Sequence, residues 1–274
     1  MNDLFATDLV TMQFNSAATT YDGAAIMQRH AANHLLQRLD IMKMDVNTVL
    51  DLGAGTGYCT LLCQQRYPHA RCIAIDSAAN MLQVIQSGVE TITARAEDIP
   101  LPDNSVDVIV SNMMLHWSTD IPQVFGEVSR VLKEGGVFLF TTLGPDTLSE
   151  LRQAWAVVDD YNHVHHFYDM HDLGDALLQA GFSDPVMDME MLTMRYNNLP
   201  QLFRDFADLG VRNVAEPRKR GLTTKKQLQA MCDAYEKFKR DDSYPASYEI
   251  LYGLAWGKNR SEITVPLSSL RRED

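Results

Sequence analysis

Apolar residues recur along the chain in two distinct patterns. From Asn47 onward, short runs rich in β-branched and aliphatic residues are separated by stretches with apolar residues three and four positions apart. The runs predict strands buried on both faces, and the stretches between them predict helices. The predicted strands are 48–51, 71–76, 90–94, 106–110 and 137–142, and the predicted helices are 58–66, 80–86 and 121–132, the last closed by Gly135 and Gly136. This alternation predicts right-handed βαβ units and a parallel sheet covered by helices on both faces.

The order is looser before and after this region. An amphipathic helix is predicted at 24–39, where Ala and Leu residues form one stripe. Further predicted helices are 147–158, 173–180, 200–209 and 224–239, and further predicted strands are 186–196 and 244–256. We therefore expect an α/β fold with one mostly parallel seven-stranded sheet and a helical lid. The expected parts are a helical cap at 1–46, a Rossmann-like core at 47–146, lid helices with the last strands at 147–260, and a flexible tail at 261–274.

Composition restricts the class of protein. The 274 residues are 46% apolar and 22% charged, with a formal net charge of -12. These values are ordinary for a globular protein, and the negative charge argues against nucleic-acid binding, which needs a basic surface. No run approaches the roughly 20 apolar residues that span a bilayer, and the amino terminus lacks a signal-peptide pattern. The four cysteines show no Cys-x-x-Cys spacing, so we expect free thiols and a cytoplasmic location.

The turn between the first predicted strand and its helix carries three glycines, Gly53, Gly55 and Gly57. Glycine lets the backbone approach a ligand closely, and such a turn is typical of nucleotide sites. Asp51 precedes the glycines, where its charge would repel a pyrophosphate but would suit a cationic amino-acid group. Asp76 ends the second predicted strand, where both carboxylate oxygens can hold ribose hydroxyls. Gly-rich turns also have purely structural uses, but together these residues favour a nucleoside ligand that carries an amino acid.

The chain from 49 to 57, with 97–102, 105–112 and 132–136, resembles the class I methyltransferases, whose cofactor is S-adenosylmethionine. The resemblance implies a Rossmann-like class I methyltransferase fold with the 1–46 cap over the cofactor. The implied cofactor-binding residues are Asp51, Gly53, Gly55, Gly57, Asp76, Ala96, Glu97 and Asn112. Many members have an Asp facing the adenine amino group where Arg95 stands here, and arginine cannot accept that hydrogen bond. The backbone around Ala96 or the side chain of Glu97 is then expected to hold adenine.

Several segments outside the core are more distinctive. They are 14–22 with 27–29, 141–151 with 154–155, and 244–248. These segments resemble the malonyl-[acyl-carrier protein] O-methyltransferases of biotin biosynthesis, and the resemblance covers nearly the whole chain. It implies methylation of the free carboxylate of a malonyl thioester on an acyl carrier protein. The chain departs from that family at His166, where we expect an arginine just before the aromatic that matches Phe167.

The implied chemistry needs no general base. A malonyl carboxylate has a pKa of about 4, so it is already an ionised nucleophile at neutral pH. Methyl transfer from a sulfonium needs in-line placement and exclusion of water. A cation is expected to fix the acceptor carboxylate, and Arg29 and Arg152 are the candidates, each with a solvated helix arginine as the alternative. Tyr21 is expected to close over the methyl donor, and His116 and Trp117 to line the acceptor pocket, with ordinary packing as the alternative.

A basic segment predicts a partner surface. Between residues 212 and 240, nine basic residues stand against three acidic ones. In a chain of net charge -12, this local excess suits an acidic acyl carrier protein. The residues expected to dock it are Arg218, Lys219, Arg220, Lys225 and Lys226. The alternative is a solvated basic helix face.

Four histidines lie close together in the sequence. They are His163, His165, His166 and His171. Histidine is the commonest metal ligand, but no helical or Cys/His ligand spacing accompanies these residues. We therefore expect no metal site there.

Two rival functions stay open on sequence grounds. The segments 115–117, 146–152 and 245–248 also resemble the mitochondrial complex I assembly factor that hydroxylates a protein arginine. That resemblance implies the same S-adenosylmethionine fold with a different reaction. A non-catalytic S-adenosylmethionine-binding assembly protein is the second rival. The block from Phe14 to Arg29 favours the methyltransferase.

Overall fold

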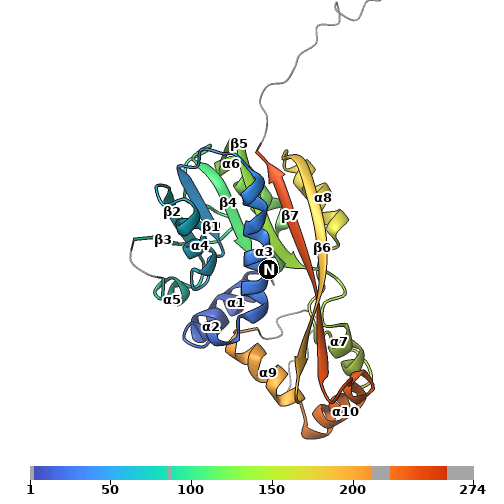
Figure 1. The fold of residues 1–274 in the computed structure, drawn as a ribbon. Coiled ribbons are helices and arrows are strands. Elements are labelled where there is room, and N and C mark those ends of the chain that lie inside the picture. Colours follow the sequence, from blue (N-terminus) through green and yellow to red (C-terminus); the bar gives the residue numbers. More distant parts are fainter. Residues whose placement is uncertain (1–2, 86–87, 212–222, 258–274) are drawn as a thin grey trace, which may run out of the picture.

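The computed structural model describes residues 3–85, 88–211 and 223–257 (Figure 1). Within these residues, seven strands form one sheet in the order β3-β2-β1-β4-β5-β7-β6. The strands are β1 (Thr48–Leu52), β2 (Arg71–Asp76), β3 (Glu90–Thr93), β4 (Val106–Asn112), β5 (Leu132–Leu143), β6 (Ser183–Tyr196) and β7 (Tyr244–Trp256). The first five are parallel, and β7 runs antiparallel to both β5 and β6. The predicted α/β fold with a mostly parallel seven-stranded sheet is confirmed.

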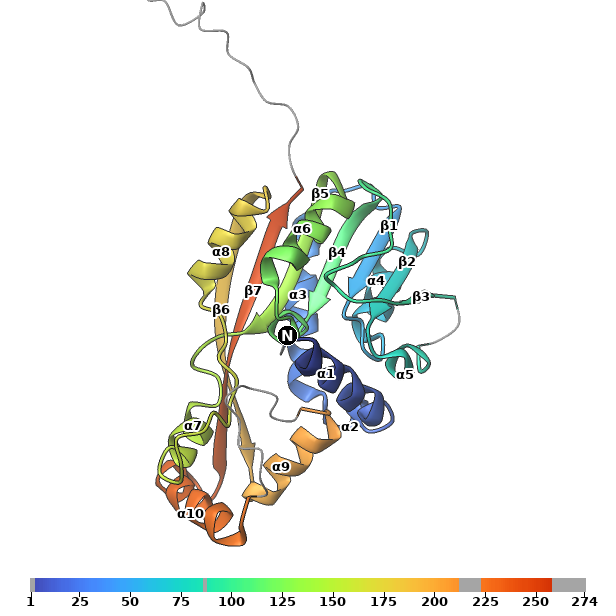
Figure 2. The same cartoon turned by 180° about the vertical axis from the view of Figure 1, so that it is seen from behind.

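Helices cover both faces of the sheet. α3 (Ile26–Gln37) and α4 (Tyr58–Arg66) lie on one face, and α6 (Ile121–Val131) and α8 (Met170–Gln179) lie on the other (Figures 1 and 2). The middle strands supply alternate side chains to the two cores. Val108 and Val110 of β4 pack with α3 and α4, while Ile109 between them packs with α6. All three are fully buried, which explains why the middle of this strand has three apolar residues in succession.

A second group of helices lies beyond the carboxyl ends of the parallel strands. It comprises α1 (Asp3–Ala17), α2 (Tyr21–Ala24), α7 (Ser149–Trp155), α9 (Leu199–Asp208) and α10 (Lys225–Tyr235). β6 and β7 extend past the sheet as a two-stranded ribbon, and α7, α9 and α10 lie around its far end (Figures 1 and 2). The hydroxyl of Thr20, just before α2, donates to the carbonyl of Asp208 in α9 at 2.7 Å. The amino-terminal helices and the lid therefore meet beyond the ends of the strands.

The end of α6 corrects the prediction of a helix over 121–132 closed by Gly135 and Gly136. The helix ends at Val131. Leu132 already belongs to β5 and pairs with Val106 of β4. Gly135 has a φ of 69°, but it lies within the strand and caps no helix. Strand pairing with β4 therefore takes over before the glycines are reached.

Two further helices depart from the sequence pattern. The sequence pattern predicts no helix at α1, because its apolar residues form no stripe but are distributed around the helix. They include Leu9, Val10, Met12 and Phe14. α5 (Ala79–Leu82) is shorter than the predicted 80–86. Short 3₁₀ helices follow α3 at Arg38–Ile41, β4 at Leu115–Trp117 and α10 at Glu236–Phe238. Among the described residues, no helix is both long enough and apolar enough to cross a membrane.

Candidate active site

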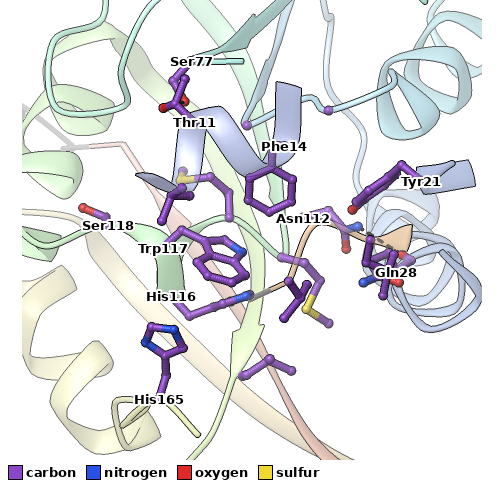
Figure 3. Close-up of a pocket in the computed structure, with 18 of the residues that line it drawn as sticks. Thr11, Phe14, Tyr21, Gln28, Ser77, Asn112, His116, Trp117, Ser118 and His165 are labelled. Carbon is purple, nitrogen blue, oxygen red and sulfur yellow. Dashed lines mark hydrogen bonds between the residues drawn. The ribbon is translucent and has the colours of Figure 1, made fainter. Parts of the chain in front are cut away.

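A cavity of about 360 Å³ lies between the carboxyl ends of the parallel strands and the helices beyond them. Its walls come from β1, β2 and β4, from α1 and from α9. Figure 3 shows the part of the wall that includes Phe14 of α1 and Asn112 of β4. A smaller space of about 40 Å³, here called the recess, adjoins this main cavity beside the turn after β1. The two share the lining residues Tyr21, Gln28, Gly53, Gly55 and Asn112. The site therefore consists of one large space and a small recess that opens from it.

The three glycines of the turn after β1 are needed for different structural reasons. Gly53, Gly55 and Gly57 have φ values of 75°, 54° and 85°, which disfavour other residues. A β-carbon at Gly53 would lie 2.3 Å from Met114, and one at Gly57 would lie 2.8 Å from Ile85. A β-carbon at Gly55 would meet no described atom within 4 Å, and Gly55 borders both the main cavity and the recess. Gly53 and Gly57 thus allow the turn to pack, whereas Gly55 leaves space open for a ligand.

Asp51 lies in the wall of the recess and is only 2% exposed. Its Oδ2 accepts a hydrogen bond of 2.6 Å from the hydroxyl of Thr60, while its Oδ1 is buried with no partner among the described residues. Oε1 of Gln28, which also lines the recess, is buried without such a partner as well. Burial raises the pKa of Asp51 to about 7. Two buried acceptor oxygens that lack donors fit a ligand with an ammonium group.

Asp76 ends β2 and faces the main cavity. One carboxylate oxygen accepts from the backbone N–H of Gly55 and the other from that of Ala78, both at 2.8 Å. Each oxygen of an ionised carboxylate keeps a second acceptor position. Burial raises the pKa of Asp76. The arrangement holds the carboxylate in one orientation with capacity to accept from two hydroxyl groups.

The residues predicted to hold adenine also line the main cavity, in the segment that follows β3. Arg95 forms an ion pair of 3.5 Å with Glu97, and the hydroxyl of Ser118 donates to Glu97 at 2.6 Å. The carboxylate of Glu97 therefore already has partners within the chain. The backbone around Ala96 remains the simpler candidate for contacts to a base.

Asn112 borders both spaces, but its side chain is used within the protein. Its Nδ2 donates to the carbonyl of Gln28 at 3.0 Å, and its Oδ1 accepts from the hydroxyl of Thr141 at 2.7 Å. These bonds connect β4 and β5 to the start of α3. The geometry favours Asn112 as a residue that positions Gln28 (Figure 3).

Tyr21 and Arg29 lie together at the recess. Tyr21 borders both spaces and has its ring centroid 6.3 Å from that of Phe14. Burial raises the pKa of the Tyr21 hydroxyl, so it stays protonated. Arg29 lines only the recess, where its guanidinium donates to the carbonyl of Asp22 and lies 5.9 Å from the centre of the Tyr58 ring. Arg29 therefore shares the wall of the recess with Asp51.

Arg152, the other arginine predicted for the acceptor, lines neither space. Its guanidinium donates to the carbonyl of Pro145 at 2.9 Å and to those of Thr147 and His165 at 3.4 Å. It therefore ties together the chain segments on either side of α7. Among the described residues, Arg95 is the only arginine or lysine that lines the main cavity. Neither predicted arginine thus lies in the wall of the main cavity.

His116 and Trp117, the residues predicted to line an acceptor pocket, follow β4 and lie in the wall of the main cavity (Figure 3). Nδ1 of His116 lies 3.3 Å from the hydroxyl of Thr142. Burial, with a smaller effect from His165, lowers the pKa of His116 to about 3, so the ring is neutral at pH 7. Trp117 packs edge to face against both Phe14 and His165, with centroids 5.4 and 5.5 Å apart.

Further aromatic residues, which no sequence pattern assigns to a site, complete this wall. Phe14 comes from α1, Phe203 and Phe206 come from α9, and Trp155 and His165 come from α7 and the chain after it. The three-residue spacing of Phe203 and Phe206 marks one face of a helix. Nothing in that spacing says that the face borders a cavity, because this depends on how the lid meets α1.

The residues predicted to dock the carrier protein lie away from the main cavity or outside the described residues. Lys225 and Lys226 are exposed in the first turn of α10. Arg218, Lys219 and Arg220 lie outside the described residues. His163, from the histidine-rich stretch, does line the main cavity, where it stacks on Trp155 with centroids 3.9 Å apart and pairs with Asp159 at 2.7 Å.

The chain is similar in sequence and in fold to known methyltransferases and related proteins. A family model described as a methyltransferase domain matches residues 50–140. The malonyl-[acyl-carrier protein] O-methyltransferase of Gallionella capsiferriformans is 41% identical over 255 residues, covering 89% of this chain and 88% of that protein. Malonyl-[acyl-carrier protein] O-methyltransferase 1 of Coxiella burnetii is 39% identical, covering 97% and 96%. The crystal structure of the YcgJ protein from Bacillus subtilis is similar in fold, with a TM-score of 0.59, 18% identity, and coverage of 84% and 98%.

Proposed function

The chain belongs to the malonyl-[acyl-carrier protein] O-methyltransferase family, and from that premise we propose that it methylates the free carboxylate of a malonyl group held as a thioester on an acyl carrier protein. It is a methyltransferase that depends on S-adenosylmethionine. The methyl ester formed is an early product of biotin synthesis. The observation that carries the proposal is the recess with two unpartnered buried oxygens, which opens into a main cavity walled mostly by uncharged side chains, several of them aromatic. The free thiols of the described cysteines agree with a cytoplasmic enzyme.

The recess and Asp76 fit the two polar parts of the cofactor. Asp51 and Gln28 supply the oxygens for its ammonium group, and Arg29 supplies a guanidinium for its carboxylate. Asp76 supplies both oxygens for the ribose hydroxyls. S-adenosylmethionine, when bound, supplies a methyl group on a positively charged sulfur. Tyr21 borders both the recess and the main cavity, and we expect its ring to shield the methyl donor from water.

The uncharged residues His116 and Trp117 suit a reaction in which a positive and a negative charge neutralise each other. A carboxylate that takes a methyl group from a sulfonium loses its negative charge as the positive charge disappears. An arginine bound to that carboxylate would stabilise the reactants more than the transition state and would slow the step. Neutral His116 and Trp117 can orient the carboxylate without this cost, while Phe14 excludes water. In our proposal, these neutral residues orient the acceptor carboxylate in place of the arginine that the sequence predicts for this role.

Arg29→Ala is expected to weaken S-adenosylhomocysteine binding by about tenfold, because a partly exposed ion pair is lost. Its transfer rate at saturating cofactor should stay close to that of the unmodified enzyme. Arg152→Ala should instead lower the melting temperature and keep cofactor affinity, since three carbonyls lose a donor. Calorimetry and initial rates measure both effects. If the Arg29→Ala enzyme binds cofactor normally but transfers no methyl group, Arg29 binds the acceptor carboxylate and our proposal for the neutral residues is wrong.

Cofactor affinity is expected to depend on pH through Asp51. Its pKa of about 7 means that roughly half of the free protein carries a protonated Asp51 at neutral pH. A ligand ammonium group favours the ionised form, so binding displaces a proton below pH 7. Affinity for S-adenosylhomocysteine should therefore fall as the pH decreases below 7, by up to about tenfold per pH unit. Titration calorimetry at several pH values measures this fall, and Asp51→Asn should abolish it. A pH-independent affinity of the unmodified enzyme would exclude this role.

The basic start of α10 is our proposed docking surface for the carrier protein. Lys225 and Lys226 are exposed in the lid, and their charge complements an acidic partner. Lys225→Glu combined with Lys226→Glu is expected to raise KM for malonyl carrier protein by about tenfold at low salt, with little change for malonyl-coenzyme A. Lys43→Glu, an exposed lysine before β1, is the control and should change neither value. Equal losses on both substrates would place docking elsewhere.

A panel of acceptors tests the function and its rivals. Labelled S-adenosylmethionine is incubated with the enzyme and free malonate, malonyl-coenzyme A, malonyl carrier protein or an arginine-containing peptide. We expect label transfer to the malonyl thioesters, fastest to the carrier protein. Hydroxylation of the peptide without label transfer would favour the arginine hydroxylase, and cofactor binding without any product would favour a non-catalytic role.

A further inference from the structure

Three metal-binding side chains converge on the surface of α3, outside the two spaces of the active site. His30 and His34 lie one turn apart on the helix, and their ring centroids are 4.1 Å apart. Both face Glu190 of the edge strand β6. Nε2 of His30 lies 2.8 Å from Oε1 of Glu190, and Nδ1 of His34 lies 3.5 Å from Oε2.

These distances are compatible with coordination of one ion. One ligand atom from each residue can be chosen such that all three lie within 4.8 Å of one another. A divalent transition metal sits about 2.0–2.2 Å from imidazole nitrogen and carboxylate oxygen, so only small side-chain movements are needed to close around it. Two histidines and a carboxylate are a ligand set that Zn²⁺ takes in proteins, with its remaining positions filled by water. The side chain of His34 is 45% exposed, which gives the ion a route from solvent.

A further residue supports the carboxylate from outside. The hydroxyl of Tyr252 in β7 donates to Oε2 of Glu190 at 2.7 Å. Hydrogen bonds of this kind orient metal-binding carboxylates and strengthen metal binding. Arg38 lies near the cluster, with its guanidinium 4.3 Å from the centre of the Tyr252 ring, but it is paired with Asp188 at 2.8 Å. The nearby positive charge is therefore balanced by its own partner.

We propose that His30, His34 and Glu190 form a binding site for one divalent transition metal ion, with Zn²⁺ as the favoured occupant. The ion would tie α3 to the edge strand β6, which pairs within the sheet only with β7. The first turn of α3 carries Met27 and Gln28, which line the main cavity. The metal thus holds the helix that positions part of the cofactor site and takes no part in methyl transfer.

Metal titration of the full chain, freed of metal with a chelator, tests the proposal. Calorimetry with Zn²⁺ should show one saturable site per chain, and Zn²⁺ should raise the melting temperature. His30→Ala, His34→Ala and Glu190→Gln should each weaken Zn²⁺ binding at least tenfold. Tyr252→Phe keeps all three ligands and should weaken binding by about 10–100-fold. His69→Ala removes an exposed histidine elsewhere and should leave Zn²⁺ binding unchanged.

Two controls separate loss of the site from loss of the fold. Each variant should still bind S-adenosylhomocysteine, and exposed His34 is the residue whose removal disturbs packing least. Zn²⁺ should raise the melting temperature of the His69→Ala protein but not that of the His34→Ala protein. No saturable Zn²⁺ binding by the unmodified chain, or binding that the ligand substitutions leave unchanged, would overturn the proposal. The cluster would then be a hydrogen-bonded contact between α3 and β6.

Discussion

Asp76→Ala is expected to lower the affinity for S-adenosylhomocysteine by more than a hundredfold. The substitution removes the acceptor that we assign to both ribose hydroxyls, and it leaves the N–H groups of Gly55 and Ala78 without their partner. Hydrogen bonds to a charged group contribute about 1.5–3 kcal/mol each, so losing two costs at least about 3 kcal/mol. At room temperature this energy corresponds to roughly a 150-fold change in the dissociation constant. Titration calorimetry with the purified variant measures it.

Asp107 supplies a matched control for Asp76. Its carboxylate also accepts from two backbone N–H groups, those of Asn47 and Thr48, at 3.0 and 2.8 Å. It pairs with Lys133 and does not line the main cavity or the recess. Asp107→Ala should therefore lower the melting temperature and leave cofactor affinity unchanged. If both variants lose affinity to the same degree, the effect of Asp76 is a general loss of stability and its assigned role is wrong.

Gly55→Ala is expected to weaken cofactor binding by roughly thirtyfold, about 2 kcal/mol of steric cost. The added methyl group would enter open space at a residue that borders both the main cavity and the recess. We propose that the cofactor occupies this space. The comparison of dissociation constants for S-adenosylhomocysteine, with melting temperatures alongside, measures the effect.

Gly135→Ala controls for backbone strain. Gly135 has a φ of 69°, close to the 54° of Gly55, and a β-carbon there would also meet no described atom within 4 Å. Both substitutions therefore carry a similar strain of about 1 kcal/mol, but Gly135 lies away from the cavities. The two variants should melt at similar temperatures, and only Gly55→Ala should lose affinity. Normal cofactor binding by Gly55→Ala would show that the ligand lies elsewhere.

The core of the fold is predictable from sequence because its signals are local. The run around Ile109 is apolar at successive positions since both faces of β4 are covered. The glycine turn and Asp76 are predictable for a related reason. In a parallel sheet the carboxyl ends of neighbouring strands meet at one edge, so residues at these ends converge whatever follows them.

The acceptor side is less predictable because it depends on contacts between distant segments. Arg29 and Arg152 look equivalent in sequence, but one lines the recess and the other binds three backbone carbonyls in the lid. Phe14 enters the site on α1, whose apolar residues form no stripe. No local pattern reports these placements, since each follows from how the lid meets the amino-terminal helices.

The most direct test of the account is the intact mass of malonyl carrier protein after incubation with the enzyme and S-adenosylmethionine. We expect the mass of malonyl carrier protein to increase by that of one methyl group in place of a proton. Acetyl carrier protein, which has no free carboxylate, should keep its mass, and Asp76→Ala enzyme should give little product. An unchanged mass of malonyl carrier protein with an enzyme that binds S-adenosylhomocysteine would contradict the account, as would methylation of acetyl carrier protein.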